Sequence, residues 1–217
     1  MLVVVACKVS TNLDQVIALD IGLPYGGQVE VGDTLVPTAR ALNGHGDSVG
    51  AEILWVALDT SAIRLIDSTT GATEGKAVGS DSLQASAGLL RSNPIRITVV
   101  AHLDSVLPLG PTVDTVMIAA DTSLSDSLSV QLYASPSAAI GRRVIFTATT
   151  FPASGPLFTF VPNDTVLSNG IGVAATRVRL DPGSAVPDSI VVVATVTRPD
   201  GTPILYSPVK FLVEFLP

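Results

Sequence analysis

β-Branched side chains dominate this sequence and limit what it can fold into. Valine, isoleucine and threonine number 29, 13 and 20, so they make up 62 of the 217 residues. These side chains lose χ1 freedom in a helix, whereas they pack well on the pleated surface of a strand. The 18 Gly and 15 Pro weaken helices further and supply turns. We therefore expect an all-β chain, long enough for two ordinary domains or one large β domain.

Overall composition excludes several classes of protein. With 47% hydrophobic and 14% charged residues, the chain is too apolar to stay disordered. Its net charge of −7 argues against sequence-independent nucleic-acid binding, because that binding needs cations that displace counterions from phosphates. One Cys excludes an intrachain disulfide framework and a metal site built from several cysteines. The low charge density leaves the surface open to association, which favours a protein partner.

The N-terminal residues contain a candidate lipid anchor, Cys7. Residues 3–6 read Val-Val-Val-Ala immediately before it. This resembles the lipobox of bacterial lipoproteins, which implies that the Cys7 thiol is acylated and that membrane lipid is a partner. Each buried methylene adds about 0.8 kcal/mol, so several acyl chains would hold the protein firmly. Because residues 2–6 are short for the apolar core of a signal peptide, a buried free cysteine in a first strand is the alternative.

The rest of the chain divides into two β regions. Residues 1–15 are assigned to the anchor and a polar tether, 16–107 to a first domain, and 125–217 to a second. Residues 108–124 are expected to form a linker, because Pro108-Leu-Gly-Pro111 breaks regular structure. No segment after Cys7 reaches the roughly 18 apolar residues that span a bilayer.

The first domain reads as short apolar or alternating runs between Gly, Pro, Asn and Asp clusters. In one alternating run Leu35 and Ala41 share a face. Pro37 cannot donate to a ladder and predicts a sheet edge there. Trp55 is predicted to lie in the core. The expected strands are 16–23, 34–42, 52–57, 63–66, 82–90 and 95–101.

Several spaced motifs of this domain agree in order with one family. They are Val31-Gly-Asp-Thr-Leu35, Trp55, Ala62-Ile-Arg-Leu-Ile-Asp67, Thr70-Gly71, Gly75 and Gly79. Together they resemble group 2 bacterial Ig-like domains over residues 16–101. The resemblance implies a small β-sandwich, used outside the cytoplasm as a spacer, adhesion or docking module, with no catalytic residues to carry over. At Ala72-Thr-Glu74 the chain lacks the aliphatic residue usual before the glycine, so the register of that hairpin stays open.

The second domain shows the spacing of strands and turns that is typical of a sandwich. Residues 169–180 resemble a characteristic strand of group 1 bacterial Ig-like domains, and 207–215 are compatible with their last strand. The fold class expected from both halves is two tandem immunoglobulin-like β-sandwiches. The strands expected in this half are 127–133, 142–150, 157–161, 172–180, 189–198 and 209–215.

Residues that could carry chemistry are few. His45 lies in a Gly-flanked turn and His102 at the end of the first domain, and no Gly-x-Ser-x-Gly elbow or phosphate-binding loop is present. We expect no catalytic residue, no cofactor and no enzyme. The boundary region also contains a group of aspartates without the spacing of a compact calcium loop. They are interpreted as solvated carboxylates with no metal site, and calcium binding stays the alternative. These residues are Asp104, Asp114, Asp121 and Asp126.

The aromatic and basic residues receive similarly plain interpretations. Four phenylalanines of the second domain are predicted to pack in its core: Phe146, Phe151, Phe158 and Phe160. Arg142-Arg143 and the pair Arg177 and Arg179 are the local positive features. The last two share a sheet face that is either simply solvated or meets an acidic partner or lipid headgroups.

These observations predict a non-enzymatic, extracytoplasmic and membrane-anchored protein, located in the periplasm or at the cell surface. Its expected role is that of a structural or accessory subunit that docks onto a larger membrane protein assembly through sheet faces or edges. Subunits of a respiratory, photosynthetic or secretion complex are equally compatible partners. The alternative is a cell-surface adhesin or glycan-binding module, which would expose an aromatic or Asp/Asn-rich patch.

Overall fold

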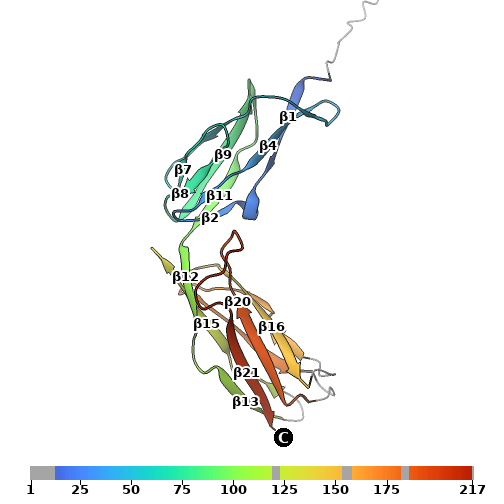
Figure 1. The fold of residues 1–217 in the computed structure, drawn as a ribbon, viewed down its shortest axis with the longest axis vertical. Helices are drawn as coiled ribbons and strands as arrows, with labels where there is room; N and C mark the ends of the chain where they lie inside the picture. Colours follow the sequence, from blue (N-terminus) through green and yellow to red (C-terminus); the bar gives the residue numbers. More distant parts are fainter. Residues whose placement is uncertain (1–12, 119–122, 153–157, 182–185, 217) are drawn as a thin grey trace, which may run out of the picture. The chain divides into compact units, whose positions relative to one another are not determined.

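The computed structural model describes residues 13–118, 123–152, 158–181 and 186–216 (Figure 1). The chain divides into two compact units, Met1–Val99 and Val100–Pro217, and each is described by itself. Both consist of β-strands, with one short 3-10 turn, η1 (Pro24–Gly27), in the first unit. Within the described residues no helix is long and apolar enough to cross a membrane.

The first unit packs two layers of strands around one core. Its strands are β1 (Val16–Gly22), β2 (Gln28–Glu30), β3 (Thr34–Leu35), β4 (Thr38–Asn43), β5 (Ser48–Val49), β6 (Leu54–Ala57), β7 (Ile63–Leu65), β8 (Thr73–Gly75), β9 (Gly79–Ala87), β10 (Leu90–Arg91) and β11 (Ile95–Val100). One layer contains β1–β4–β5 and β3–β8–β7. The other has the order β10–β9–β11–β2, with β6 also beside β9.

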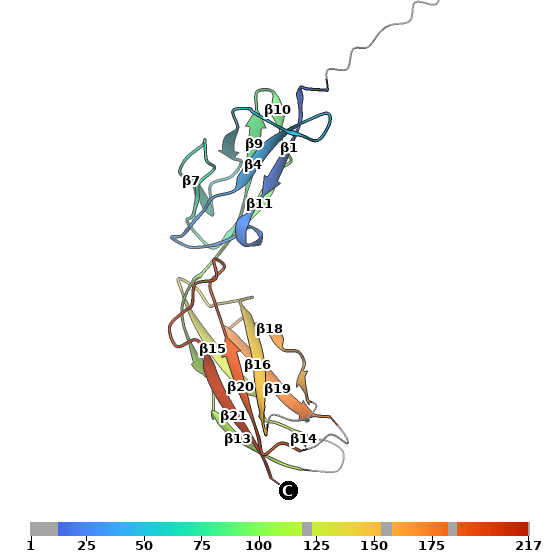
Figure 2. The same cartoon turned by 45° about the vertical axis from the view of Figure 1, so that its right-hand side comes forward.

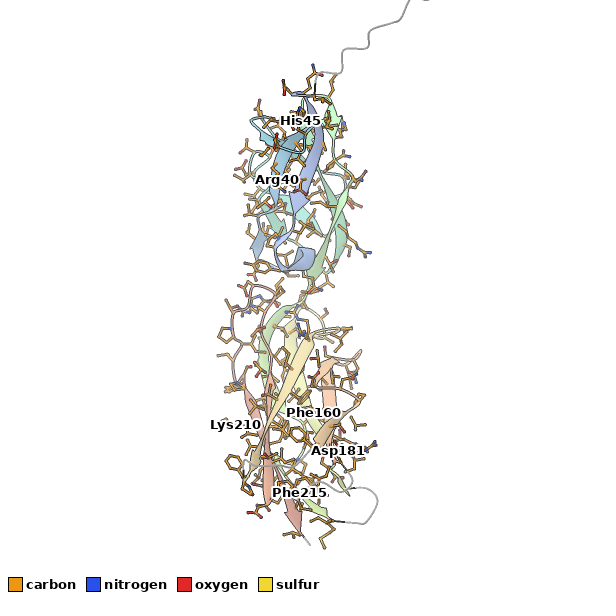
Figure 3. The ribbon with its side chains drawn as sticks, turned by 90° about the vertical axis from the view of Figure 1, so that its right-hand side faces the viewer. Arg40, His45, Phe160, Asp181, Lys210 and Phe215 are labelled. Atoms are coloured by element: carbon orange, nitrogen blue, oxygen red, sulfur yellow. The ribbon has the colours of Figure 1, made fainter. Side chains whose placement is uncertain are left out.

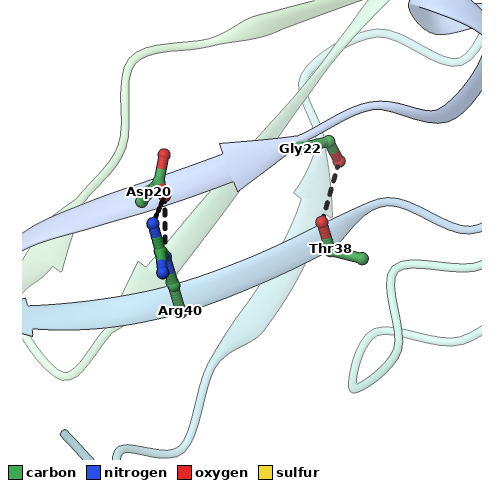
Figure 4. A network of polar contacts seen from close by, with 4 residues as sticks. All are labelled: Asp20, Gly22, Thr38 and Arg40. Carbon is green, nitrogen blue, oxygen red and sulfur yellow. Dashed lines mark hydrogen bonds and ion pairs between the residues drawn. The ribbon is translucent and has the colours of Figure 1, made fainter. Parts of the chain in front are cut away.

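The alternation predicted for residues 34–42 is confirmed, and Pro37 divides the strand. Leu35 and Ala41 are each 1% exposed, whereas Arg40 faces solvent. Without an N–H at Pro37 the ladder stops, so this segment forms β3 and β4 instead of one strand. On the solvent side, Arg40 pairs with Asp20 at 2.7 Å, and the Thr38 hydroxyl donates to the Gly22 carbonyl at 3.4 Å (Figure 4).

Trp55 lies in the core of the first unit, as predicted, and it explains a motif glycine. Gly71 has φ +76°, and a Cβ at this position would lie 2.9 Å from the indole ring of Trp55. The left-handed backbone and the close ring both require glycine. Gly71 lies between β7 and β8, the two strands of a hairpin that pairs Ile63 with Gly75. Thr73 is fully buried, and its hydroxyl donates to the Gly71 carbonyl at 2.8 Å.

Asp81 is a buried carboxylate that organises the loop before β7. Its Oδ2 accepts the backbone N–H groups of Ala62 and Ile63 at 2.6 and 3.0 Å, and its Oδ1 accepts the Ser61 hydroxyl at 3.0 Å. Burial alone would raise the pKa of Asp81, but these hydrogen bonds outweigh it and lower the pKa below the ordinary value. Asp81 is therefore structural.

The second unit also has two layers, shown from two directions in Figures 1 and 2. Its strands are β12 (His102–Pro108), β13 (Val113–Met117), β14 (Ser123–Leu124), β15 (Leu128–Ser135), β16 (Arg143–Phe151), β17 (Phe158–Val161), β18 (Thr165–Leu167), β19 (Val173–Leu180), β20 (Ser189–Thr195) and β21 (Val209–Leu216). One layer has the order β12–β15–β19–β14, with β17 also beside β19. The other has the order β13–β21–β20–β16–β18.

Both units have immunoglobulin-like strand order, so the predicted fold class is confirmed. In the second unit β12, β15, β19 and β17 correspond to strands A, B, E and D, and β16, β20 and β21 to C, F and G. In the first unit β1, β4, β8 and β7 form the first of these layers, and β6, β9 and β11 the second. The cores are separate: Trp55 and Leu83 belong to one cluster, Phe146 and Phe211 to the other.

The boundary between the units differs from the expected linker at residues 108–124. The division falls between Val99 and Val100, and this segment contributes β13 and β14 to the second unit. Pro108-Leu-Gly-Pro111 does break regular structure, but it does so between two strands of one unit. β12 pairs with β15 in one layer, and β13 pairs with β21 in the other. The break is thus the crossing of the first strand from one sheet to the other.

Candidate interaction surface

The residues considered for chemistry do not assemble a catalytic group in the described part of the chain. His45 is exposed in the turn after β4, where its backbone N–H donates to the side-chain oxygen of Asn43. His102 begins β12, and its Nε2 lies 3.0 Å from the guanidinium of Arg198. Arg198 also donates to the Leu103 carbonyl, so this pair holds β12 to the loop after β20.

Cys7 and Asp121 lie outside the described residues. Asp104 is exposed, and Asp114 accepts the backbone N–H of Asp126 at 2.8 Å. Within the described residues these three aspartates form no group of ligands around a common point. The bond between Asp114 and Asp126 ties β13 to the segment before β15, which is a structural role.

Besides Asp81 on β9, the carboxylates Asp67 and Asp200 have a lowered pKa, and both lie in turns. In Asp67 the N–H and hydroxyl of Thr69, followed by the hydroxyl of Thr70, lower the pKa of the carboxyl group. In Asp200 the N–H and hydroxyl of Thr202 do the same. These are the hydrogen bonds of Asx-type turns and not the signature of an acid–base catalyst.

The aromatic and basic residues divide between core and surface. Phe146 is 1% exposed, and Phe158 and Phe160 pack against its core cluster. The rings of Phe158 and Phe160 meet edge to face with their centroids 5.7 Å apart. The core prediction is wrong for Phe151, which is 49% exposed at the end of β16. Arg142 is buried, so it is no surface charge. Its backbone N–H donates to the Ser168 hydroxyl.

One outer sheet face of the second unit has unusual chemistry. Alternate residues of β13, β16, β20 and β21 point away from the core and form a surface that we name the Val/Thr face. Such positions are ordinarily polar in an antiparallel sheet with one face in solvent. On this face they are mostly valine, threonine and larger apolar residues. The members are Val113, Thr115, Met117, Arg143, Ile145, Thr147, Thr149, Phe151, Ser189, Val191, Val193, Thr195, Lys210, Leu212, Glu214 and Leu216.

The strand register places an uncharged row across the middle of this face. Leu212 pairs with Val113 on one side and with Val191 on the other, and Val191 pairs in turn with Thr149. Directly paired residues on one face of neighbouring strands touch through their side chains. The row is therefore a continuous uncharged strip across four strands, apolar except for the Thr149 hydroxyl, and we call it the apolar strip.

Lys210 and Glu214 are the charged members of the Val/Thr face on either side of its central row, and Arg143, exposed at the start of β16, is a third at the far end. Lys210 and Glu214 are both exposed and lie on β21, two residues before and two residues after Leu212 (Figure 3 labels Lys210). Because side chains alternate along a strand, both project to the same side as Leu212. The opposite charges thus flank the apolar strip symmetrically.

The other outer face of the same unit is different. On β19, Arg177 and Arg179 are exposed and share a face, as predicted, and on the neighbouring β15 Ser129 and Gln131 point the same way. Tyr133 and Leu107 also lie on this face, 48% and 39% exposed, so it mixes apolar and polar groups and carries two positive charges. The two arginines therefore lie on the sheet opposite the Val/Thr face.

The sequence interpretation missed the Val/Thr face, although it contains a signal for it. Residues 190–194 read Ile-Val-Val-Val-Ala without a polar alternate. Such a run predicts a strand covered on both faces. In the structure Ile190, Val192 and Ala194 are buried, and Val191 and Val193 are only partly covered.

A hollow in the first unit offers little for catalysis. It encloses about 300 Å³ and is lined by Val31, Gly32, Arg64, Glu74, Gly75 and Lys76. Nε of Arg64 donates to Glu74 at 2.8 Å, so the two charged groups neutralise each other at its wall. The lining contains no nucleophile held beside a base, which covalent catalysis requires.

Comparison with known proteins gave structural similarities only. No protein-family model and no curated protein matches the chain. The adhesin InvE of Yersinia pseudotuberculosis matches at a TM-score of 0.43 and 16% identity, over 91% of this chain and 58% of that structure. The D0–D1 domains of intimin match at 0.35 and 16%, over 91% and 98%. Domains 4 and 5 of the S-layer protein SbsC match at 0.33 and 13%, over 94% and 100%.

Proposed function

We propose that this chain is a non-enzymatic module of the bacterial cell surface, which works by binding a protein partner through the Val/Thr face. The observation that carries the proposal is the apolar strip of Val113, Leu212, Val191 and Thr149 on a face that no other described element covers. Exposed apolar patches of this kind mark protein-binding surfaces in soluble proteins.

The chemistry of the face favours a protein over a glycan as the partner. Carbohydrate sites stack sugar rings on exposed aromatic side chains. Among the members of the Val/Thr face, Phe151 alone is aromatic, and it lies at the end of β16. β-Branched residues and leucine instead match the apolar side chains of another protein.

The extracytoplasmic location rests on two sequence features. The motifs of residues 31–79 resemble bacterial Ig-like domains, and Cys7 resembles the acylated cysteine of lipoproteins. An acylated Cys7 would hold the module at a membrane, where it would serve either in adhesion or as an accessory subunit of a membrane assembly. The Val/Thr face would then be the surface that meets the partner.

Site-specific photo-crosslinking in the producing bacterium tests the binding face. A benzophenone amino acid at position 191 lies in the apolar strip, and the same group at position 177 lies on the opposite sheet. We expect protein adducts from position 191 and none from position 177. Equal adducts from both positions, or none from 191, would contradict the proposal.

A Cys7→Ser variant tests the membrane attachment. The wild-type protein should fractionate with membranes and carry the added mass of acyl chains, and the variant should lose both. An unmodified wild-type mass would contradict acylation of Cys7. The binding role of the Val/Thr face would then be decided by the crosslinking experiment alone.

A further inference from the structure

We infer that the partner of the Val/Thr face is a second copy of this chain, packed face to face about a two-fold axis that crosses β21 at Leu212. The inference rests on the proposed function, because it assigns an occupant to the same face. The positions of Lys210 and Glu214 support a second copy as the partner, and the strand register defines which residues of the two copies would face each other.

The two charges are arranged for self-association. Lys210 and Glu214 lie on either side of Leu212, each about 7 Å away along the strand at about 3.3 Å per residue. A two-fold axis in the plane of the interface, perpendicular to β21 at Leu212, exchanges these positions. Lys210 of each copy then lies opposite Glu214 of the other, so both charges of both copies are paired.

The charges also select one orientation. If the two-fold axis ran along β21 instead, the strands of the two copies would be parallel and Lys210 would face Lys210. Like charges placed opposite each other across an interface are costly. The antiparallel arrangement is therefore favoured, with the two sheets packed about 10 Å apart.

The same two-fold axis also places uncharged residues of one copy opposite uncharged residues of the other. Rotation about it keeps each strand over its own copy, so Val191 lies over Val191 and Thr149 over Thr149. Residues one row away exchange, so that Phe151 of one copy faces Thr147 of the other. The apolar strip thus forms the dry centre of the interface, and the charge pairs lie beside it.

The size of the face indicates a weak dimer. Four strands at about 4.8 Å spacing and about 20 Å in length, from each of two copies, bury on the order of 1,000 Å² in total, which is the lower limit for specific interfaces. We therefore expect a dimer dissociation constant in the micromolar range. Two copies held at a membrane by their anchors would meet at higher effective concentration than in solution.

Charge exchange at the two positions tests this arrangement in the full chain. Sedimentation equilibrium at low salt, with Cys7 kept reduced, should show a concentration-dependent dimer for the wild type. The Lys210→Glu and Glu214→Lys variants should each dimerise about tenfold more weakly or worse, because both charge contacts become repulsive. The double variant K210E/E214K should regain wild-type dimerisation.

Mixing the two single variants gives the sharpest result. One copy with two glutamates and one with two lysines place opposite charges at both contacts, so the mixture should form a heterodimer that neither variant forms alone. Loss of stability in either variant cannot produce this outcome. Arg177→Glu on the other sheet is the matched control and should leave dimerisation unchanged.

A wild-type chain that stays monomeric, or single variants that dimerise like the wild type, would overturn the inference. The proposed function would survive that result if position 191 still crosslinks to a different protein in the bacterium. Absence of any adduct from position 191 would instead contradict the proposed function itself.

Discussion

The two units share a strand order but differ on the outer face of the corresponding sheet. In the first unit, β9 and β11 present serines, Gln84, Arg96 and Thr98 to solvent. These groups bond one another: the Arg96 guanidinium donates to the Ser80 hydroxyl at 3.0 Å, and the Gln84 amide donates to the Ser92 carbonyl at 2.8 Å. In the second unit the matching positions on β20 and β21 are mainly Val, Thr and Leu.

This difference shows that strand order and surface function are separate properties of the sequence. Both units fill their interiors with inward-pointing apolar residues, which is enough to specify the sandwich. The outward positions are free to vary: β9 and β11 of the first unit carry polar groups there, and the neighbouring β6 exposes Leu54 and Val56 at 42% and 43%. The second unit leaves an apolar surface, which gains free energy only when a partner covers it.

The largest expected effect separates inward from outward positions on one strand. Phe146 and Phe151 both lie on β16, but Phe146 is 1% exposed and Phe151 is 49% exposed. Phe146→Ala should destabilise the second unit by about 3–5 kcal/mol, because it leaves a large cavity. Phe151→Ala should cost about 1 kcal/mol or less. Hydrogen exchange of β16 and β20 measures both, and equal losses would refute the distinction between the two faces.

A somewhat smaller effect is expected in the first unit at Gly71. Gly71→Ala places a Cβ against Trp55 in a left-handed backbone, and it should destabilise the unit by about 3 kcal/mol. Gly46 has φ +84° with open space around it, so Gly46→Ala should show only the backbone cost of about 1 kcal/mol. Urea unfolding followed by Trp55 fluorescence reports on this unit. If both variants lose the same stability, the packing of Gly71 against Trp55 contributes nothing.

Asp81 should make the first unit sensitive to acid. Because hydrogen bonds lower its pKa in the folded protein below the ordinary 3.8, its stabilising contribution is complete above about pH 4 and is lost as pH falls through the folded pKa. Asp81→Asn should cost about 2 kcal/mol at neutral pH and remove that part of the pH dependence. Asp20→Asn, which alters an exposed ion pair, should cost about 0.5 kcal/mol or less. An unchanged acid profile in Asp81→Asn would contradict this role.

The smallest stability effect is expected on the Val/Thr face. Val193→Thr keeps the β-branched shape and the strand preference, so the second unit should change in stability by no more than about 0.5 kcal/mol. Thermal unfolding of the full chain measures this. A loss of several kcal/mol would mean that Val193 belongs to the core, and the contrast between the two outer faces would disappear.

Much of the fold follows from the sequence because inward residues repeat with the period of a strand. All six strands expected in the second half were found, and Trp55 lies in the core. The segment 102–117 was harder, because Pro108 and Pro111 resemble a linker when strand pairing is unknown. β13 pairs with β21, about a hundred residues later in the chain, and no local pattern reveals such a partner.

The candidate surface could be foreseen only in part. The run Ile190 to Ala194 indicates a strand that is apolar on both sides, but not which side faces the core. The symmetry of Lys210 and Glu214 about Leu212 has meaning only once the register places Val191 and Val113 beside Leu212. Cross-strand register is a tertiary property, so this part of the surface needed the structure.

The parallel pairing of β13 with β21 has a mechanical consequence. The chain enters β13 and leaves β21 at opposite ends of the same ladder, which runs from Val113 with Leu212 to Met117 with Leu216. A pull on the end of β21 against the chain before β13 is therefore directed along both strands in opposite senses. The hydrogen bonds between β13 and β21 are then loaded in shear and must break together, whereas a peeling force would break them one at a time. The last strand thus makes the second unit resistant to extension.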